Sequence, residues 1–424
     1  MILNPWITIL KSLTLVTFVS ASLASATTLP HPHMDLELSG AEYQKILEQE
    51  RNSSQTILSN EMVPQKHIFD DIFATGKRNL DWLQVINKNR TTPISLTTPE
   101  TQVGYPIDNP RTYNPKIIRD AYLQLQQEMP SELKKVIFGN EELPNTLPVS
   151  DEDYILWGLK VDREYQIAAR WKTMEPYMDY LKSNSMNDIR GYYFLTTTEG
   201  FPNKLKDWPS LTQEEQMKVK TWLLQVCRND LQSNQRCLTQ TENAINANKA
   251  FDFFNQHKNA GQDLLNEMMF IPSNGKYSSA HWTASNEFHV PFVDPMTDPM
   301  RFFLTNNIET EWKFLPFTLL IDFVQTTNSG VEVIWEPGIT PHVPSLGSNK
   351  IYMDSNAPIS EYDVQWTIRH EFGHVLGFPD CYIEFYDGDI QAIVGYQIDI
   401  TDLMCSRRGH LKARHITELK KNYN

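Results

Sequence analysis

Residues 370 to 380 read His-Glu-Phe-Gly-His-Val-Leu-Gly-Phe-Pro-Asp, and they constrain the chain more than any other segment. If this segment is helical, His370 and His374 lie about 40° apart around the axis and project from one face. That geometry suits two ligands of a tetrahedral zinc ion. Glu371 lies one step round the helix, where its carboxylate can reach a water at the metal without joining the ligands. The motif therefore predicts a zinc site with Glu371 as the general base.

The flanking residues favour a helix around the two histidines. Ser360 is a good N-cap, and Asp363 adds negative charge to the first turn. An apolar stripe at helical spacing is centred roughly 150° away from the histidines. It consists of Val364, Ile368, Phe372, Val375 and Leu376. We therefore expect the helix to bury this stripe and to turn both histidines toward a cleft.

The residues after His374 predict how a third ligand reaches the metal. Gly377 can end the helix in a left-handed turn, and Pro379 prevents the helix from continuing. The chain then presents Asp380, six residues after His374, whose carboxylate can serve as the third protein ligand. An open fourth position for water distinguishes a catalytic zinc site from a structural one.

This pattern, H-E-x-x-H-x-x-G-x-x-D, resembles the signature of the metzincin metalloproteases, in the variant with Asp in place of the third His. The bacterial snapalysins are similar in this respect. Residues 402 to 406, Asp-Leu-Met-Cys-Ser, resemble the Met-turn that lies below the zinc in metzincins. The resemblance implies three zinc ligands, namely His370, His374 and Asp380. It also implies that Glu371 is the general base of peptide hydrolysis and that Met404 forms the floor of the site.

The resemblance further implies a fold, with a twisted mixed sheet, an active-site helix, a Met-turn and a C-terminal helix. Two residues depart from the family pattern. Asp380 replaces the commoner His, so the zinc would carry one negative ligand. Ser406 stands where astacin-like enzymes have a tyrosine, and no residue is therefore assigned to stabilise the transition state. The specific resemblance covers residues 370 to 406.

The rest of the chain predicts an α+β fold with a mainly helical N-terminal region. Apolar residues at helical spacing predict helices at 36–50, 116–129, 151–181 (interrupted near Pro176), 210–228 and 242–269. Runs of β-branched and aromatic residues predict strands at 192–198, 280–293, 317–325, 331–336 and 350–353. A capping box at Thr212 and Glu215 and a hairpin turn at 328–330 are also predicted. We expect three parts: a signal peptide at 1–26, a helical region of unknown role at 27–184 and a catalytic domain at 185–424.

Residues 12 to 26 contain a short apolar centre and end on Ala24-Ser25-Ala26, the small-x-small pattern of a signal-peptide cleavage site. The segment is too short and too polar for a membrane anchor, which needs about 20 apolar residues. We therefore expect a secreted or periplasmic protein with no integral membrane segment after cleavage. The chain has 38 basic and 52 acidic residues, and its net charge of −14 argues against nucleic-acid partners. The expected partner is a peptide or protein substrate.

Export permits disulfides among the four cysteines, Cys227, Cys237, Cys381 and Cys405. Four cysteines allow three pairings, and the sequence alone does not choose among them. We favour Cys381–Cys405, because these residues directly follow the third ligand and the turn methionine, and a bridge would tie the two segments together. Cys227 and Cys237 would then pair locally between helices.

Other candidate residues carry less weight. Five further histidines are expected to be structural: His281, His289 and His342 in or beside the strand region, and His410 and His415 in the last helix. The acidic turns at 387–389 and 294–298 could hold calcium, but neither has an EF-hand spacing, and we expect solvated loops.

Three alternatives to this interpretation stay open. The first is a zinc hydrolase with a distal third ligand, as in gluzincins, for which the candidates are Glu384, Asp399 and Asp402. The second is an exported non-enzymatic binding protein with an idle metal site, although the intact Glu371 argues against it. The third is a zymogen whose N-terminal region masks the cleft. No cysteine precedes Cys227, which excludes a cysteine-switch prodomain.

Overall fold

The computed structural model describes residues 65–88, 90–96, 104–175, 178–183, 185–356, 359–360 and 362–423. All of these residues belong to one unit that spans Asp35–Asn424. The predicted signal peptide at 1–26 and the predicted helix at 36–50 lie outside the described residues. Among the residues described, no helix is both long and apolar enough to cross a membrane.

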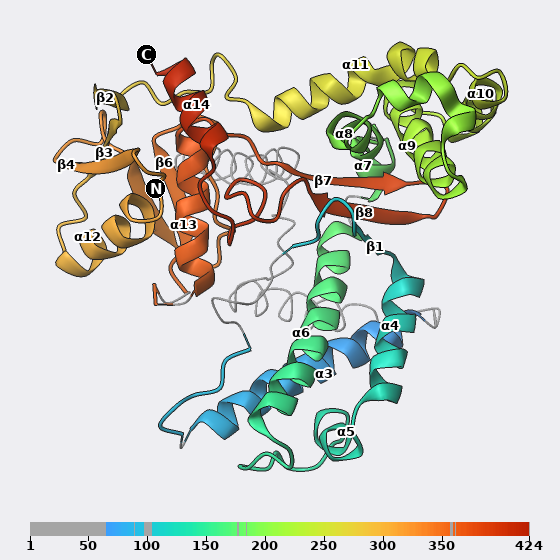
Figure 1. Cartoon of the computed structure of the whole chain (residues 1–424). Helices are drawn as coiled ribbons and strands as arrows, with labels where there is room; N and C mark the ends of the chain where they lie inside the picture. The colour runs from blue at the N-terminus through green and yellow to red at the C-terminus, as the bar shows by residue number, and fades with distance from the viewer. Residues whose placement is uncertain are drawn as a thin grey trace, which may run out of the picture. The chain divides into compact units, whose positions relative to one another are not determined.

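The chain combines many helices with small sheets, which confirms the α+β class at this coarse level (Figure 1). The α-helices are α3 (Gln65–Asn87), α4 (Pro115–Glu128), α5 (Ser131–Ile137), α6 (Asp151–Met174), α7 (Met178–Ser183), α8 (Arg190–Thr197), α9 (Gln213–Leu231), α10 (Asn234–Asn246), α11 (Ala250–Met269), α12 (Asp298–Leu304), α13 (Tyr362–Val375) and α14 (Ala413–Asn422). Shorter helical turns are η2 (Asn203–Ser210) and η3 (Thr305–Glu309). The strands are β1 (Arg111–Tyr113), β2 (His281–Ala284), β3 (Glu287–Val293), β4 (Thr318–Val324), β5 (Glu332–Glu336), β6 (Lys350–Asp354), β7 (Tyr382–Asp387) and β8 (Ala392–Gln397).

The strands of the described chain form three small sheets. β2, β3 and β4 make a mixed sheet, in which β2 is antiparallel and β4 parallel to β3. β5 and β6 form a parallel pair that meets β3 through one bridge between Phe292 and Val331. β1, β8 and β7 form an antiparallel sheet, and sequence reasoning missed its long β7–β8 hairpin. The β2–β3–β4 sheet is therefore mixed, with three strands.

The hairpin predicted at residues 328–330 is wrong, because β4 and β5 do not pair. Val331 instead exchanges hydrogen bonds with Pro291 and Val293 at the end of β3. β4 runs parallel to β3, and Val331, directly before β5, forms a parallel bridge with Phe292 of β3. The loop between them therefore carries the chain over the end of β3 without reversing its direction.

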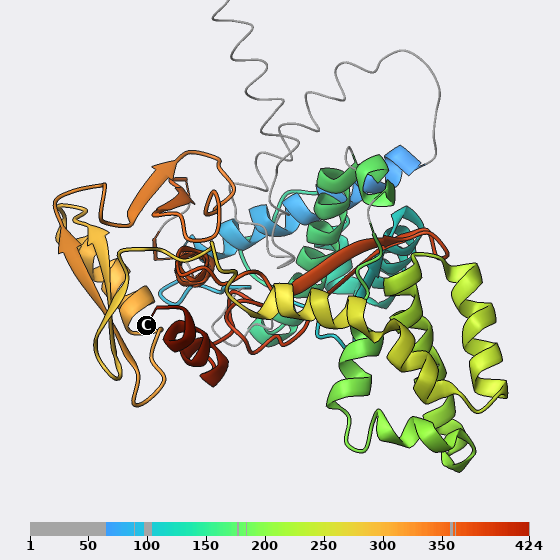
Figure 2. The same ribbon diagram turned by 90° about the horizontal axis from the view of Figure 1, so that it is seen from above.

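The strand predicted at 192–198 is also wrong, because this segment lies in helix α8. Tyr192 stacks on Phe254 and Phe194 stacks on Trp222, with ring centroids 6.4 and 5.3 Å apart. Aromatic residues favour strands through packing on a pleated surface rather than through the backbone itself. Here α9 and α11 supply the surface, and Figure 2 shows α8 to α11 packed as one group (green to yellow).

The helical run predicted at 242–269 spans two helices, α10 and α11. Asn248 lies between them with a φ of 53°, in the left-handed region that ends helices. The capping box at Thr212 and Glu215 is confirmed. The remaining predicted helices and strands are confirmed with small shifts at their ends, at 116–129, 151–181, 210–228, 317–325, 331–336 and 350–353. The single strand predicted at 280–293 is instead two antiparallel strands, β2 and β3, joined by a turn at residues 285–286.

The region before residue 184 is joined to the C-terminal part of the chain by a shared sheet and by a buried ion pair. β1 pairs along its length with β8, as Figure 1 shows. Arg170 in α6 donates to Glu384 in β7 at 2.8 Å, and each side chain is only 2% exposed. The Tyr113 hydroxyl donates to the same carboxylate. The division predicted between residues 184 and 185 therefore runs through a packed interface.

Arg170→Met is expected to lower the free energy of unfolding by about 3–5 kcal/mol, because Glu384 would keep a buried charge without its cation. Urea unfolding followed by circular dichroism measures this change. Lys172→Met is the matched control on the same helix, since it breaks an ion pair with the exposed Glu175 and a cation–π contact with Phe69 but leaves no buried charge unpaired. The control should cost less than about 1 kcal/mol. Equal losses in the two variants would contradict an anchoring role for Arg170.

Candidate metal centre

Helix α13 is covered along most of its length. From Trp366 to Val375 every residue is buried, so the predicted apolar stripe is covered as expected. Phe372 packs against Phe292 and Trp312, with ring centroids 5.5 and 5.2 Å apart. Residue 361 lies outside the described residues, and the predicted N-cap at Ser360 is therefore not described.

The face that carries the motif is buried as well, which differs from the open cleft expected there. His370, Glu371 and His374 expose 1%, 0% and 7% of their surfaces. Their ligand-type atoms all lie within 4.8 Å of one another. The Asp380 side chain remains one-third exposed and is the most open member of the centre.

The end of α13 turns the chain back as the sequence predicts. Gly377 has a φ of 90°, and its N–H donates to the His374 carbonyl at 3.0 Å. The Phe378 N–H donates to the Gly373 carbonyl, also at 3.0 Å. These two bonds form a Schellman motif. A side chain at Gly377 would also overlap the Gly275 carbonyl, so glycine is required there twice over.

This turn brings the three predicted ligands together. The Nε2 atoms of His370 and His374 lie 3.1 and 3.3 Å from the same Asp380 oxygen. The two imidazole rings are perpendicular, with centroids 4.8 Å apart. Ligands bound at about 2.1 Å in a tetrahedral zinc site are separated by about 3.4 Å. The donor atoms therefore have the chemistry and the spacing to hold a metal ion.

Backbone carbonyls fix how each histidine presents its ring. Nδ1 of His370 donates to the Leu403 carbonyl, and Nδ1 of His374 donates to the Phe378 carbonyl, both at 2.8 Å. A carbonyl only accepts, so each Nδ1 carries a hydrogen. Nε2 is consequently the atom that binds either a second proton or a metal.

The charges at the centre favour a cation between the ligands. Burial lowers the pKa of His374, but the Asp380 carboxylate outweighs it and raises the pKa to about 9. Burial raises the pKa of Asp380, but His374 and His370 hold it well below its usual range. At neutral pH the metal-free centre therefore keeps a proton on His374, which a metal has to displace.

Met404 packs against the middle of the motif. It is fully buried, and a side chain at Gly373 would overlap its sulfur. Gly373 lies between the two histidines, so the thioether fills the space under the middle of the motif. The Cys381 N–H donates to the Met404 carbonyl at 3.1 Å, which joins the ligand segment to the turn.

Both predicted disulfides are present. Cys381–Cys405 ties the residue after the third ligand to the residue after Met404. Cys227–Cys237 connects α9 to α10, as expected for a local bridge between helices.

The carboxylates proposed as distal third ligands have other partners. Glu384 pairs with Arg170, and Asp399 accepts hydrogen bonds within its own loop. Asp402 forms a two-point ion pair with Arg414. Of the acidic candidates, Asp380 is thus the one that the structure places against both histidines.

The other candidate histidines have structural surroundings. His289 lies between Glu287 and Asp322, and His342 stacks on Tyr352. His281 stacks on the His289 ring. His415 contacts Asp402 from α14, whereas His410 precedes that helix, contrary to the prediction.

The acidic turns considered for calcium are each held by an arginine. Asp294 pairs with Arg301 at 2.9 Å, and Asp387 pairs with Arg228 at 2.7 Å. The same arginines also pair with the second aspartate of each turn, Asp298 and Asp389.

Sequence reasoning missed the groups that support the ligands: the Leu403 and Phe378 carbonyls and the Arg414 guanidinium. Backbone acceptors leave no mark on a sequence, because every residue carries one. Gly373 could have indicated the packing of Met404, since a glycine between the two histidines leaves room for the methionine side chain against the helix.

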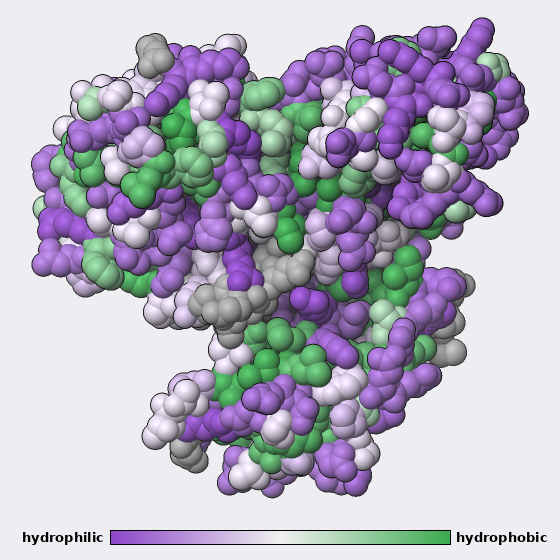
Figure 3. Space-filling model, in the orientation of Figure 1, coloured by the Kyte–Doolittle hydropathy of each residue, from purple (hydrophilic) through white to green (hydrophobic). Residues whose placement is uncertain are grey.

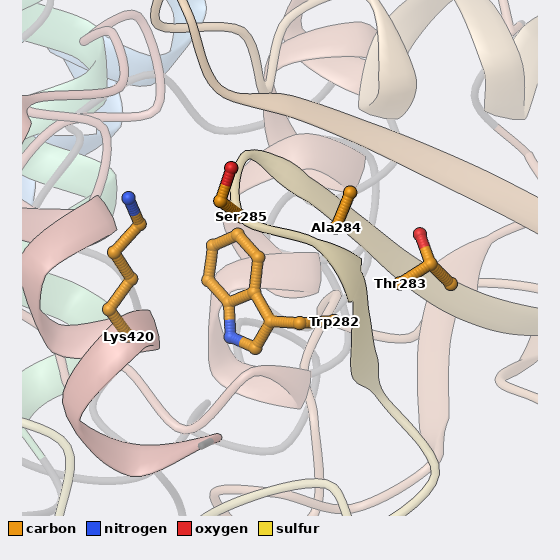
Figure 4. A pocket seen from close by; sticks show the side chains of 5 residues that line it. All are labelled: Trp282, Thr283, Ala284, Ser285 and Lys420. Atoms are coloured by element: carbon orange, nitrogen blue, oxygen red, sulfur yellow. The ribbon is translucent and has the colours of Figure 1, made fainter.

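A separate hollow of about 400 Å³ lies at the β2 hairpin and α14 (Figure 4). Its lining residues are Trp282, Thr283, Ala284, Ser285 and Lys420. None of them belongs to the metal centre. In the face shown in Figure 3, hydrophilic residues predominate and apolar ones are scattered among them.

No protein-family model matches the chain, and neither curated proteins nor solved structures contain a match. Function therefore has to be inferred from the geometry of the centre itself.

Gly373→Ala is expected to destabilise the protein by about 1–3 kcal/mol, because the added methyl group would overlap Met404. Met404→Ala returns the space, so the double variant should lose less than the sum of the two single variants. Urea unfolding of the four proteins measures this coupling. Gly388→Ala is the control, since a side chain there meets no atom within 4 Å. Additive losses would rule out the contact.

Proposed function

We propose that the chain is an exported zinc-dependent metallopeptidase of the metzincin type. The observation that carries the proposal is the convergence of both histidine Nε2 atoms on one Asp380 oxygen, 3.1 and 3.3 Å away. Three protein ligands of this kind leave a fourth position for water or substrate, as catalytic zinc sites do. Of the three proposed ligands, Asp380 is the one whose side chain reaches the surface, where it is one-third exposed.

In this proposal each residue has a defined task. His370 and His374 are held by carbonyls so that Nε2 faces the metal, and Asp380 supplies the third ligand. A bound zinc ion would supply a Lewis acid that polarises the scissile carbonyl and acidifies a water. Glu371 takes the proton from the attacking water and returns it to the leaving amine. The two disulfides fit export into an oxidising compartment.

A second candidate is an exported binding protein in which the metal only stabilises the fold. The near-complete burial of His370, Glu371 and His374 favours it, because structural zinc sites are closed. The Glu371 carboxylate disfavours it, since a structural site has no use for a buried general base beside its ligands. The two functions differ in what the loss of Glu371 does.

Glu371→Gln is expected to keep about one zinc per chain and to lose casein hydrolysis by at least about 100-fold, because it removes the proton acceptor. Metal analysis and a casein assay on purified wild type and variant measure both properties. Zinc in both proteins with equal activity would refute Glu371 as the base. Zinc in both with no activity in either would favour the binding protein or a masked zymogen.

Deleting residues 27–184 is a poor test of the masked zymogen. The deletion would remove β1 from its sheet and leave Glu384 without Arg170. A test of whether the N-terminal region masks the metal centre has to keep β1 and Arg170 in place. It therefore follows autolytic trimming of the full chain over time.

Asp380→Ala is expected to weaken zinc binding by more than the roughly 10–100-fold that the loss of a supporting residue costs, since it removes a direct ligand. Asp399→Ala is the matched control, because it deletes a carboxylate that was also a candidate ligand. Competition with a chromogenic chelator measures both affinities. Unchanged affinity in Asp380→Ala would favour a distal third ligand.

A further inference from the structure

The carbonyls that accept hydrogen bonds from His370 and His374 lie at very different distances along the chain. His374 donates to the Phe378 carbonyl, four residues onward in the same helix-ending loop. His370 donates to the Leu403 carbonyl, which is 33 residues away. The orientation of His374 is thus a local property, whereas that of His370 depends on where the turn at 402–406 lies.

The Asp402 side chain holds this turn from within. It is 1% exposed, and one of its oxygens accepts the Met404 N–H at 2.9 Å. Arg414 grips both carboxylate oxygens, Nε at 2.6 Å and Nη2 at 2.7 Å. His415 Nε2 lies 3.2 Å from the same carboxylate. Such two-point pairs fix geometry as well as charge.

Arg414 ties the turn to a separate part of the fold. Its Nη1 donates to the Met269 carbonyl at the end of α11, at 3.0 Å. Arg414 itself belongs to the first turn of α14. The Cys381–Cys405 bridge also reaches the turn, but Cys381 directly follows Asp380 in the ligand segment. Arg414 contacts Cys381 as well, with Nη2 3.6 Å from its sulfur, and in addition it ties the turn to the end of α11, which carries no proposed ligand.

We propose that Arg414, acting through Asp402 and the turn at 402–406, is a positioning residue that aims His370 Nε2 at the metal. Arg414 touches neither metal nor substrate in this role. The inference rests on the proposed zinc site, and it assigns control of metal affinity to a helix that carries no ligand.

The first test is zinc affinity of the full chain with Arg414→Met, measured by competition with a chromogenic chelator. The expected loss is about 10–100-fold, as for other supporting residues of metal ligands. Lys421→Met is the matched control, since Lys421 lies on the same helix, carries the same charge and is 63% exposed. The control should bind zinc within about twofold of wild type. Equal affinity of Arg414→Met and wild type would overturn the inference.

The second test separates positioning from a general loss of stability. Nitrogen-15 NMR of the imidazoles in the metal-free chain follows the Nδ1–H groups of His370 and His374. Arg414→Met should shift or broaden the His370 signal and leave the His374 signal in place. Arg414→Lys, which keeps the charge but loses the two-point grip, should show a smaller change of the same kind. Equal changes at both histidines, or none at His370, would refute the role.

The outcomes also separate this inference from the proposed function. A wild-type chain that binds no zinc would refute the metallopeptidase, while the NMR comparison would still decide what Arg414 does to His370. A wild-type chain that binds zinc as tightly as Arg414→Met would refute only the positioning role. If Arg414→Met does not fold, Arg414→Lys carries both measurements.

Discussion

The Nε2 atoms of His370 and His374 both contact one carboxylate oxygen of Asp380, and this close contact requires a positive charge between the three atoms. Both Nε2 atoms are within 3.3 Å of the same Asp380 oxygen. Burial lowers the pKa of His374, but the Asp380 carboxylate outweighs it and raises the pKa, so a proton on His374 supplies the charge when no metal is bound. Two features of the surrounding structure keep these three side chains together. The turn at Gly377 brings Asp380 back to the end of the helix, and Met404 packs against the helix at Gly373.

The sequence predicted those parts of the centre whose geometry is local. The spacing of His370 and His374, the left-handed Gly377 and the return of Asp380 all lie within eleven consecutive residues, where helix geometry and turn chemistry decide the outcome. The disulfide at Cys381 followed from its place beside the third ligand. Burial of the histidines could not be predicted, because it depends on segments far away in the chain.

The same distinction explains the errors in the fold. Tyr192 and Phe194 are residue types that favour strands, but here they lie in a helix because their rings stack on aromatic residues of α11 and α9. Residues 328–330 have the composition of a hairpin turn, but β4 before them and Val331 after them both run parallel to β3, so no hairpin forms. Local propensity ranges over about 1 kcal/mol and yields to packing of this kind. The β7–β8 hairpin was missed although its Glu384 anchors the helices before residue 184.

The disulfides join cysteines that follow one another along the chain, the first with the second and the third with the fourth. An oxidant that acts on the cysteines in their order along the chain meets Cys227 and Cys237 before Cys381 and Cys405. Joining each cysteine to the next one in the sequence then yields the native bonds directly. Neither native bond encloses another cysteine, so both can form without a non-native bond being broken and remade first.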